Sequence, residues 1–234
     1  MIKYLIALIV GMLAGVVLFA TLLYFNPLTK QQSLSPLSVS QHEVAVLNYS
    51  AVAADSLIFT NDGESQVQPY PPKVLQLWEG PVRSTTTRVT VLSNAADEPV
   101  GIGVKFSSES ETTDILNGQA NVDSVWHIYV PQRGSFFVAQ SENYWNYIRD
   151  VVLPAYWSSG DNWRGQWMGR VTSGPGALGT ARVAGGSGDF EGLESEAVET
   201  MTARAYSVDK GPVALRGQLA VEIPGAEVAA TPDP

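Results

Sequence analysis

The chain contains no cysteine and only two histidines among its 234 residues. The absence of cysteine excludes a disulfide framework, a thiolate zinc site and an iron–sulfur cluster. Two histidines cannot form a three-histidine metal site, so we expect neither a metal nor another cofactor. Basic residues are also scarce, because 14 Lys and Arg stand against 23 Asp and Glu, for a net charge of -9. Phosphate binding needs a basic surface, so no nucleic-acid partner is expected.

The longest uncharged run lies at the N-terminus. Residues 4–25 form 22 consecutive positions without a charged side chain. As a helix this run spans about 33 Å, enough to cross the roughly 30 Å hydrocarbon core of a bilayer. A cleaved signal peptide is the alternative, but its apolar core is typically about 7–15 residues long. The sequence favours an uncleaved, single-pass anchor over residues 1–25, held in the lipid bilayer.

The charges beside this predicted anchor bear on its orientation. The amino terminus and Lys3 precede the apolar run, and Lys30 follows it. The positive-inside rule then favours a cytoplasmic N-terminus and an exported C-terminal domain, which is periplasmic if the source is bacterial. The predicted location is therefore the inner (cell) membrane.

Small residues recur every fourth position on the predicted anchor, at Ala7, Gly11 and Gly15. Such a stripe lets a second membrane helix approach closely. The alternative is that glycine and alanine are simply frequent in membrane helices. We predict these three residues as a candidate packing face toward another membrane-protein subunit.

The remainder divides by composition into three parts. Residues 26–43 are rich in Ser, Gln, Pro and Leu and are predicted to be a spacer. Residues 225–234 are predicted to be a disordered tail. Residues 44–224 are long enough for one exported domain with a full core.

The sequence of this domain predicts mainly β-strands. Turn sequences at 94–99 and 131–134 each separate two alternating segments and predict hairpins, and residues 213–223 form the clearest alternating strand. A helix is predicted over 142–153, capped by Ser141 and ended by Pro154. The predicted fold is an antiparallel β-barrel-like domain with one inserted helix, preceded by the transmembrane helix.

Residues 182–192 form a glycine-rich stretch. A phosphate-binding P-loop is excluded because no lysine follows the glycines. A dinucleotide fingerprint is disfavoured because β-prone residues follow the motif. Ser187 does not fit a nucleophile elbow, since Asp189 stands where glycine is needed. We predict a glycine-rich hairpin with Phe190 packed onto the core.

Gly185-Gly-Ser-Gly-Asp-Phe-Glu-Gly192, with the strands that follow it, resembles the C-terminal hairpins of the allene oxide cyclase-like and dirigent β-barrels. Their usual pattern is Gly-Gly-Thr-Gly-x-Phe-x-Gly-Ala-x-Gly. The resemblance covers residues 163–224 and departs from the pattern at 193–195, where Leu-Glu-Ser replaces small residues. It implies an eight-stranded barrel, commonly trimeric, whose apolar cavity guides cyclisation or coupling of reactive small molecules. No catalytic residue of that family matches a position here, so the catalytic residues are unknown.

Aromatic residues concentrate between positions 126 and 167, which hold five of the six Trp. Tryptophan and tyrosine suit ligand pockets and interfaces, although core packing and a membrane-surface contact are alternatives. The candidate ligand or partner contacts are Trp126, His127, Tyr129, Trp145, Trp157, Trp163 and Trp167. His127 could transfer protons or could be structural, and it shares a strand face with Val125 and Tyr129.

An acidic run follows the glycine-rich stretch, at Glu191, Glu194, Glu196 and Glu199. Paired carboxylates perform acid–base chemistry only when burial raises a pKa, and the expectation here is a solvated strand face.

Two functions remain open. The first is a non-enzymatic accessory or assembly subunit of a larger membrane complex, in contact with other membrane-protein subunits or with copies of itself. The second is a β-barrel that binds a small apolar molecule, with possible cyclase or isomerase activity in which His127 or a buried carboxylate moves protons. The lack of a recognisable catalytic constellation favours the first.

Overall fold

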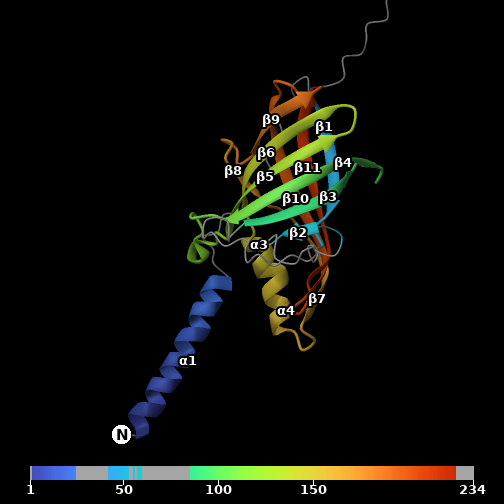
Figure 1. The fold of residues 1–234 in the computed structure, drawn as a ribbon. Helices are drawn as coiled ribbons and strands as arrows, with labels where there is room; N and C mark the ends of the chain where they lie inside the picture. The colour runs from blue at the N-terminus through green and yellow to red at the C-terminus, as the bar shows by residue number, and fades with distance from the viewer. Residues whose placement is uncertain (1, 25–41, 53–54, 56, 60–84, 225–234) are drawn as a thin grey trace, which may run out of the picture.

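The computed structural model describes residues 2–24, 42–52, 55, 57–59 and 85–224 (Figure 1). The predicted tail (225–234) and all of the predicted spacer except residues 42 and 43 lie outside the described residues. Helix α1 (Ile2–Tyr24) covers the apolar N-terminal run. Among the described residues, a search for a helix long and apolar enough to cross a membrane found none.

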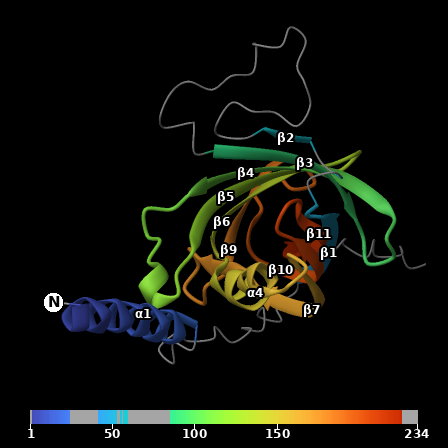
Figure 2. The same cartoon turned by 90° about the horizontal axis from the view of Figure 1, so that it is seen from below.

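The domain is an antiparallel sheet whose strands form a ring (Figure 2). Around the ring the order is β1-β11-β10-β9-β6-β5-β4-β3, and a pairing between Asn48 of β1 and Ser93 of β3 closes it. The ring strands are β1 (His42–Ser50), β3 (Thr85–Ser93), β4 (Pro99–Glu109), β5 (Asn121–Val130), β6 (Gly134–Asn143), β9 (Ala181–Gly188), β10 (Glu194–Ser207) and β11 (Gly211–Pro224). A short strand, β2 (Leu57–Phe59), pairs with β3.

Two further strands fill the wall between β6 and β10 at one end of the ring. β7 (Asn162–Arg170) pairs with the second half of β10, and β8 (Thr172–Gly174) pairs with the end of β6. Val171, between them, accepts a backbone hydrogen bond from Asn143 of β6 and donates one to Glu199 of β10. The first part of β6 (134–139) and the first part of β10 (194–197) pair instead with β9.

The two predicted hairpins are confirmed. β3 and β4 pair around the turn at 94–98, and β5 and β6 pair around the turn at 131–133. In the first turn, the side-chain oxygen of Asn94 accepts hydrogen bonds from the backbone N–H groups of Ala96 and Glu98. Such a contact, which a short amide side chain makes with nearby backbone, favours a turn over a continuing strand.

One helical segment lies between β6 and β7, at the end of the ring (Figures 1 and 2). It consists of α3 (Trp145–Tyr147), a π-helical turn (Ile148–Val152) and α4 (Leu153–Trp157). A single 3-10 turn, η2 (Ile115–Asn117), lies in the β4–β5 connection.

The predicted bounds of this helix, 142–153, were wrong at both ends. β6 continues to Asn143, whose side chain accepts the backbone N–H of Trp145 at 2.9 Å, while Ser141 donates to Asp123 instead of capping. Pro154 lies inside the helical segment. It occupies the first turn of α4, where a residue without an N–H is tolerated.

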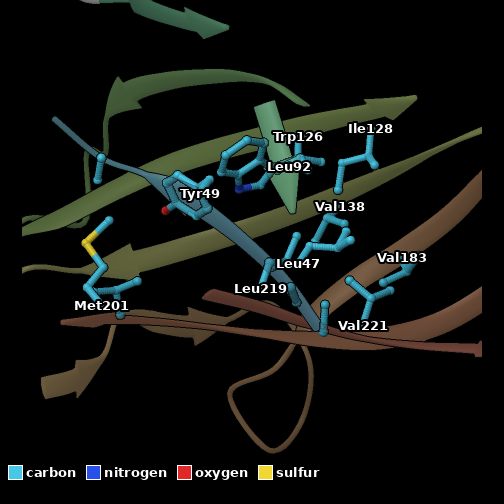
Figure 3. Packing of buried hydrophobic residues seen from close by; sticks show 14 of the residues in the cluster. Leu47, Tyr49, Leu92, Trp126, Ile128, Val138, Val183, Met201, Leu219 and Val221 are labelled. Carbon is cyan, nitrogen blue, oxygen red and sulfur yellow. The ribbon is translucent and has the colours of Figure 1, made fainter. Parts of the chain in front are cut away.

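The core fills the inside of the ring. In the close view of Figure 3, Leu47, Leu92, Ile128, Val138 and Leu219 point inward from five strands. The predicted packing of Phe190 onto the core is confirmed, because this residue is buried with its ring 4.9 Å from that of Phe136. Burial of such large apolar side chains is the main force that holds the ring closed.

The alternating face of β4 points outward rather than inward. Ile102 and Phe106 share one face and are 47% and 46% exposed. The inner positions are Gly101, Gly103 and Lys105. A Cβ at Gly103 would lie 2.8 Å from the ring of Trp126, so this glycine makes room for the indole inside the ring.

Candidate functional site

Three charged side chains meet inside the ring. The ammonium group of Lys105 on β4 lies 2.5 Å from an oxygen of Glu142 on β6 and 2.9 Å from an oxygen of Glu199 on β10. Lys105 is 5% exposed and both glutamates are fully buried. Strand alternation places each of them inward. Lys105 and Glu199 lie in the interior of β4 and β10, and Glu142 lies next to the end of β6. Burial of a charged group is costly unless an opposite charge and hydrogen-bond partners compensate for the lost water.

Glu199 is surrounded by hydrogen-bond donors. Its carboxylate accepts from the hydroxyl of Tyr49, from the amide of Gln140 and, at 3.1 Å, from the indole nitrogen of Trp126. Burial alone would raise the pKa of Glu199, but the charge of Lys105 and these donors outweigh burial and hold the pKa below its ordinary value. The expectation that Glu199 lies on a solvated strand face was therefore wrong, because its side chain points into the ring.

Glu142 has a different environment. It accepts hydrogen bonds of 2.6 Å from Ser124, from Gln140 and from the hydroxyl of Tyr144. Burial raises the pKa of Glu142, and the charge of Glu199 raises it further, against the opposing effect of Lys105. Of the two carboxyl groups, Glu142 thus has the greater affinity for a proton, and Glu199 is the one that holds its charge.

The remaining titratable groups of the cluster hold their protons firmly. Burial would lower the pKa of Lys105, but the two carboxylates outweigh it and raise the pKa above its ordinary value. Burial and the neighbouring carboxylates raise the pKa of Tyr49 and of Tyr144 well above the usual tyrosine range. The cluster therefore contains a stable ammonium group, two neutral phenols and two carboxyl groups, of which Glu142 has a raised pKa and Glu199 a lowered one.

Two pockets reach this cluster from different sides. One, of about 300 Å³, is lined by Lys105 and Tyr144 together with inner residues of β3, β4 and β5. The other, of about 280 Å³, lies where β1 and β3 join and is lined by Tyr49 and Thr90. A further pocket, of about 700 Å³, lies on the outer surface of β10 and β11, away from the cluster.

The arrangement can stabilise negative charge and transfer protons. Lys105 presents an ammonium group beside the first pocket, and Tyr144 presents a phenol whose proton is directed at Glu142. Among the described residues, no three His, Cys, Asp or Glu side chains are grouped so as to hold a metal ion. Tyr144 and Glu142 are a hydrogen-bonded pair between which a proton can move.

Of the predicted contact residues, only Trp126 belongs to the cluster. Its indole is fully buried, donates to Glu199 and lies edge-on to the ring of Tyr49 at 4.9 Å. His127 and Tyr129 follow it on β5 but face outward, and His127 stacks on Phe137 at 4.7 Å. The sheet wall thus separates His127 from the buried carboxylates.

The other four predicted tryptophans lie around the helical segment and β7. Trp145 is buried, Trp163 and Trp167 are half-buried against the core, and Trp157 is 64% exposed. The ring of Trp167 lies edge-on to that of Tyr147 at 5.3 Å. These four residues lie at the end of the ring, and they do not form one site with Trp126.

The predicted packing face of the anchor is only partly described. Space is open around Gly11 and Gly15 of α1, where an added Cβ would meet nothing within 4 Å. The side chain of Ala7 lies outside the described residues.

Sequence reasoning missed most of the cluster. Lys105 and Tyr49 were not singled out, and Glu142 was placed in a helix. One signal was available: Gly101, Gly103 and Lys105 alternate on β4, and two glycines beside a lysine on one strand face indicate close packing against large side chains.

No family model matches the sequence, and no curated protein matches it.

Proposed function

We propose that the end of the ring next to Lys105 and Tyr144 binds a small molecule and exchanges protons with it. One observation supports this proposal: these two side chains belong both to the buried cluster and to the wall of a pocket of about 300 Å³. That volume is at the lower end of the range for small-molecule sites. A bound molecule would meet an ammonium group and a phenol, with the two carboxyl groups behind them.

The reaction class that fits these groups is isomerisation by proton transfer. Tyr144 takes a proton from one atom of the molecule while its own proton moves along the 2.6 Å hydrogen bond to the Glu142 carboxylate. Lys105 stabilises the resulting anion. Glu142 then returns the proton through Tyr144 to a different atom, so that no co-reactant is consumed. A raised pKa makes Glu142 a stronger base for this purpose than an exposed glutamate.

This proposal modifies the sequence-based alternative of an apolar ligand. The inner apolar half of the ring is filled by its own side chains, whereas most residues that line the pocket beside Lys105 carry a polar or charged group. The isomerase interpretation rests on the cluster and not on the resemblance to allene oxide cyclase-like and dirigent barrels, which stays a prediction.

Tyr144→Phe tests the proposal, since it removes the phenol and keeps the ring. Binding of a fragment library to the full-length protein would be measured by ligand-observed NMR, with Tyr129→Phe on the outer face as the matched control. We expect fragments that bind the native protein and the control, and that bind Tyr144→Phe measurably more weakly. Unchanged binding by a Tyr144→Phe protein that keeps the native melting temperature would refute a site at this pocket.

A second candidate function is favoured by the outer face of β3 to β6. Six large apolar side chains are exposed there, in register across neighbouring strands: Val91, Ile102, Phe106, Val125, Tyr129 and Phe137. Contiguous exposed apolar surface of this kind is typical of protein interaction sites. We infer that a membrane-anchored accessory subunit would use this face to contact another subunit or a copy of itself.

The anchor of this second candidate is the uncharged run at 4–25, with the N-terminus in the cytoplasm and the domain in the periplasm. Substituting both Gly11 and Gly15 with leucine is expected to release a partner helix. Native mass spectrometry of the full-length protein, extracted gently from its own membranes, measures this. Partner stoichiometry that does not change in the double variant contradicts a packing role for the small-residue stripe.

A further inference from the structure

The wall of the pocket next to Lys105 carries two adjacent pairs of polar residues. Arg88 of β3 lies directly opposite Lys105 of β4, and Thr86 lies directly opposite Ser107, one inner position farther from the middle of the strands. All four residues line the same pocket. We propose that this pocket selects molecules that carry a carboxylate or a related oxyanion, and that Arg88 is the residue that binds this group.

Arg88 differs from Lys105 in its partners. The ammonium group of Lys105 already contacts two buried carboxylates, so a carboxylate on the ligand would have to compete with them for direct contact with it. No ion pair found among the described residues includes Arg88. Arg88 is half-buried, and its positive charge acts on Tyr49, which places it in the field of the cluster. Its guanidinium group is thus the cation of this pocket that remains for a ligand.

The residues around Arg88 match an oxyanion in chemistry. A guanidinium group presents two parallel N–H donors in the geometry of a carboxylate or phosphate. The hydroxyl groups of Thr86 and Ser107 supply further donors in the same part of the wall. Glu109 also lines the pocket, but it is exposed and lies beyond Ser107 on β4, at the rim. An anionic group is therefore favoured at Arg88 and disfavoured at the rim.

This inference rests on the proposed function and orients the molecule within it. With its anionic group at Arg88, the body of the molecule lies against Val122 and the ring of Tyr144. Its reacting atoms then lie between Tyr144 and Lys105, where a proton is removed and returned. Arg88 is a binding and positioning residue, and the proton transfer belongs to Tyr144 and Glu142.

Matched carboxylates and carboxamides test the inference, because each pair differs only in charge. Benzoate with benzamide, and hexanoate with hexanamide, would be titrated into the full-length protein by ligand-observed NMR. The variants are Arg88→Gln, which removes the charge, and Arg88→Lys, which keeps it without the planar fork. Arg133→Gln is the control, because Arg133 pairs with Asp189 on the exposed surface.

We expect each carboxylate to bind the native protein and the control about tenfold or more tightly than its amide, the usual margin for hydrogen bonds to a charged group. Arg88→Gln removes that preference, and Arg88→Lys keeps part of it. Equal binding of both members of each pair to the native protein overturns the inference about anions but leaves the pocket as a ligand site. A preference that persists in Arg88→Gln overturns the role of Arg88. Failure of every probe to bind at millimolar concentration overturns the proposed function together with the inference.

Discussion

The ring of Tyr49 lies directly against the backbone of Gly217, its partner across the β1–β11 pair, and occupies the space that a side chain at position 217 would need. The same tyrosine reaches Glu199 with its hydroxyl and packs edge-on against Trp126. Gly217 therefore fixes the position of a residue that belongs to the buried cluster. The fit explains why a glycine interrupts the otherwise large inner residues of β11.

Gly217→Ala is expected to lower the free energy of unfolding by about 1–3 kcal/mol, as overpacking of a filled core does. The added methyl group must displace Tyr49 and lengthen its hydrogen bond to Glu199. Urea unfolding followed by tryptophan fluorescence measures the change. Gln218→Ala, at the next and outward-facing position, should change stability by less than about 0.5 kcal/mol. Equal effects of the two substitutions would contradict the close fit.

Lys105→Met tests the charge balance of the cluster. Removing the ammonium group leaves two buried carboxylates facing each other, which should cost about 3–5 kcal/mol at neutral pH. The deficit relative to the native protein should shrink as the pH falls toward about 4, since protonation makes the carboxyl groups neutral. Unfolding curves of both proteins at several pH values measure this. A deficit that is the same at every pH would contradict the ionic account.

The two glutamates should respond differently to replacement by glutamine. The pKa of Glu199 is lowered, so its ionised form is stabilised by the fold, and this stability is present above the ordinary glutamate pKa and lost as the pH falls. The pKa of Glu142 is raised, chiefly by burial, so the fold does not stabilise its ionised form relative to the unfolded chain. We expect Glu199→Gln to destabilise the protein clearly more than Glu142→Gln in urea unfolding at neutral pH. The reverse order would contradict the assignment of charge within the pair.

The strands and turns of this fold could be predicted from the sequence because their signals are local. The turn at 94–98 and the alternation over 213–223 each depend on residues close in the chain, and both hairpins are confirmed. The helix bounds were less predictable. Asn143 both ends β6 and accepts the backbone N–H of Trp145, and Pro154 stands in the first turn of α4, directly after a π-helical turn.

The candidate site could not be predicted in the same way, because its members are far apart in sequence. Lys105 and Glu199 are separated by 94 positions, and Tyr49 and Glu199 by 150. Alternation shows that Ile102 and Phe106 share a face of β4 but does not show which face is inside. Only the closed ring reveals that the large apolar residues lie outside and the lysine lies inside.

The buried tyrosines predict a loss of stability at high pH. The pKa of Tyr49 and of Tyr144 is raised in the folded protein, so their contribution is fully present below the unfolded tyrosine pKa of about 10 and is lost above it. Each tyrosine should lower the free energy of unfolding by about 1.4 kcal/mol per pH unit in that range. Thermal unfolding above pH 10 should therefore be less steep in pH for Tyr144→Phe than for the native protein. Phe137→Leu, a control without a titrating group, should keep the native slope.

His127 supplies the last prediction, because its position excludes it from the chemistry inside the ring. It lies on the outer face of β5, stacked on Phe137, while its neighbour Trp126 points to Glu199. His127→Ala should therefore leave the binding of carboxylate probes unchanged within about twofold, whereas hydrogen bonds lost at a charged site change affinity tenfold or more. The same substitution should weaken contact with a partner subunit if the outer apolar face is an interface, which native mass spectrometry of the extracted complex measures. Loss of probe binding in His127→Ala, with the melting temperature unchanged, would move the ligand site from the inside of the ring to its outer face.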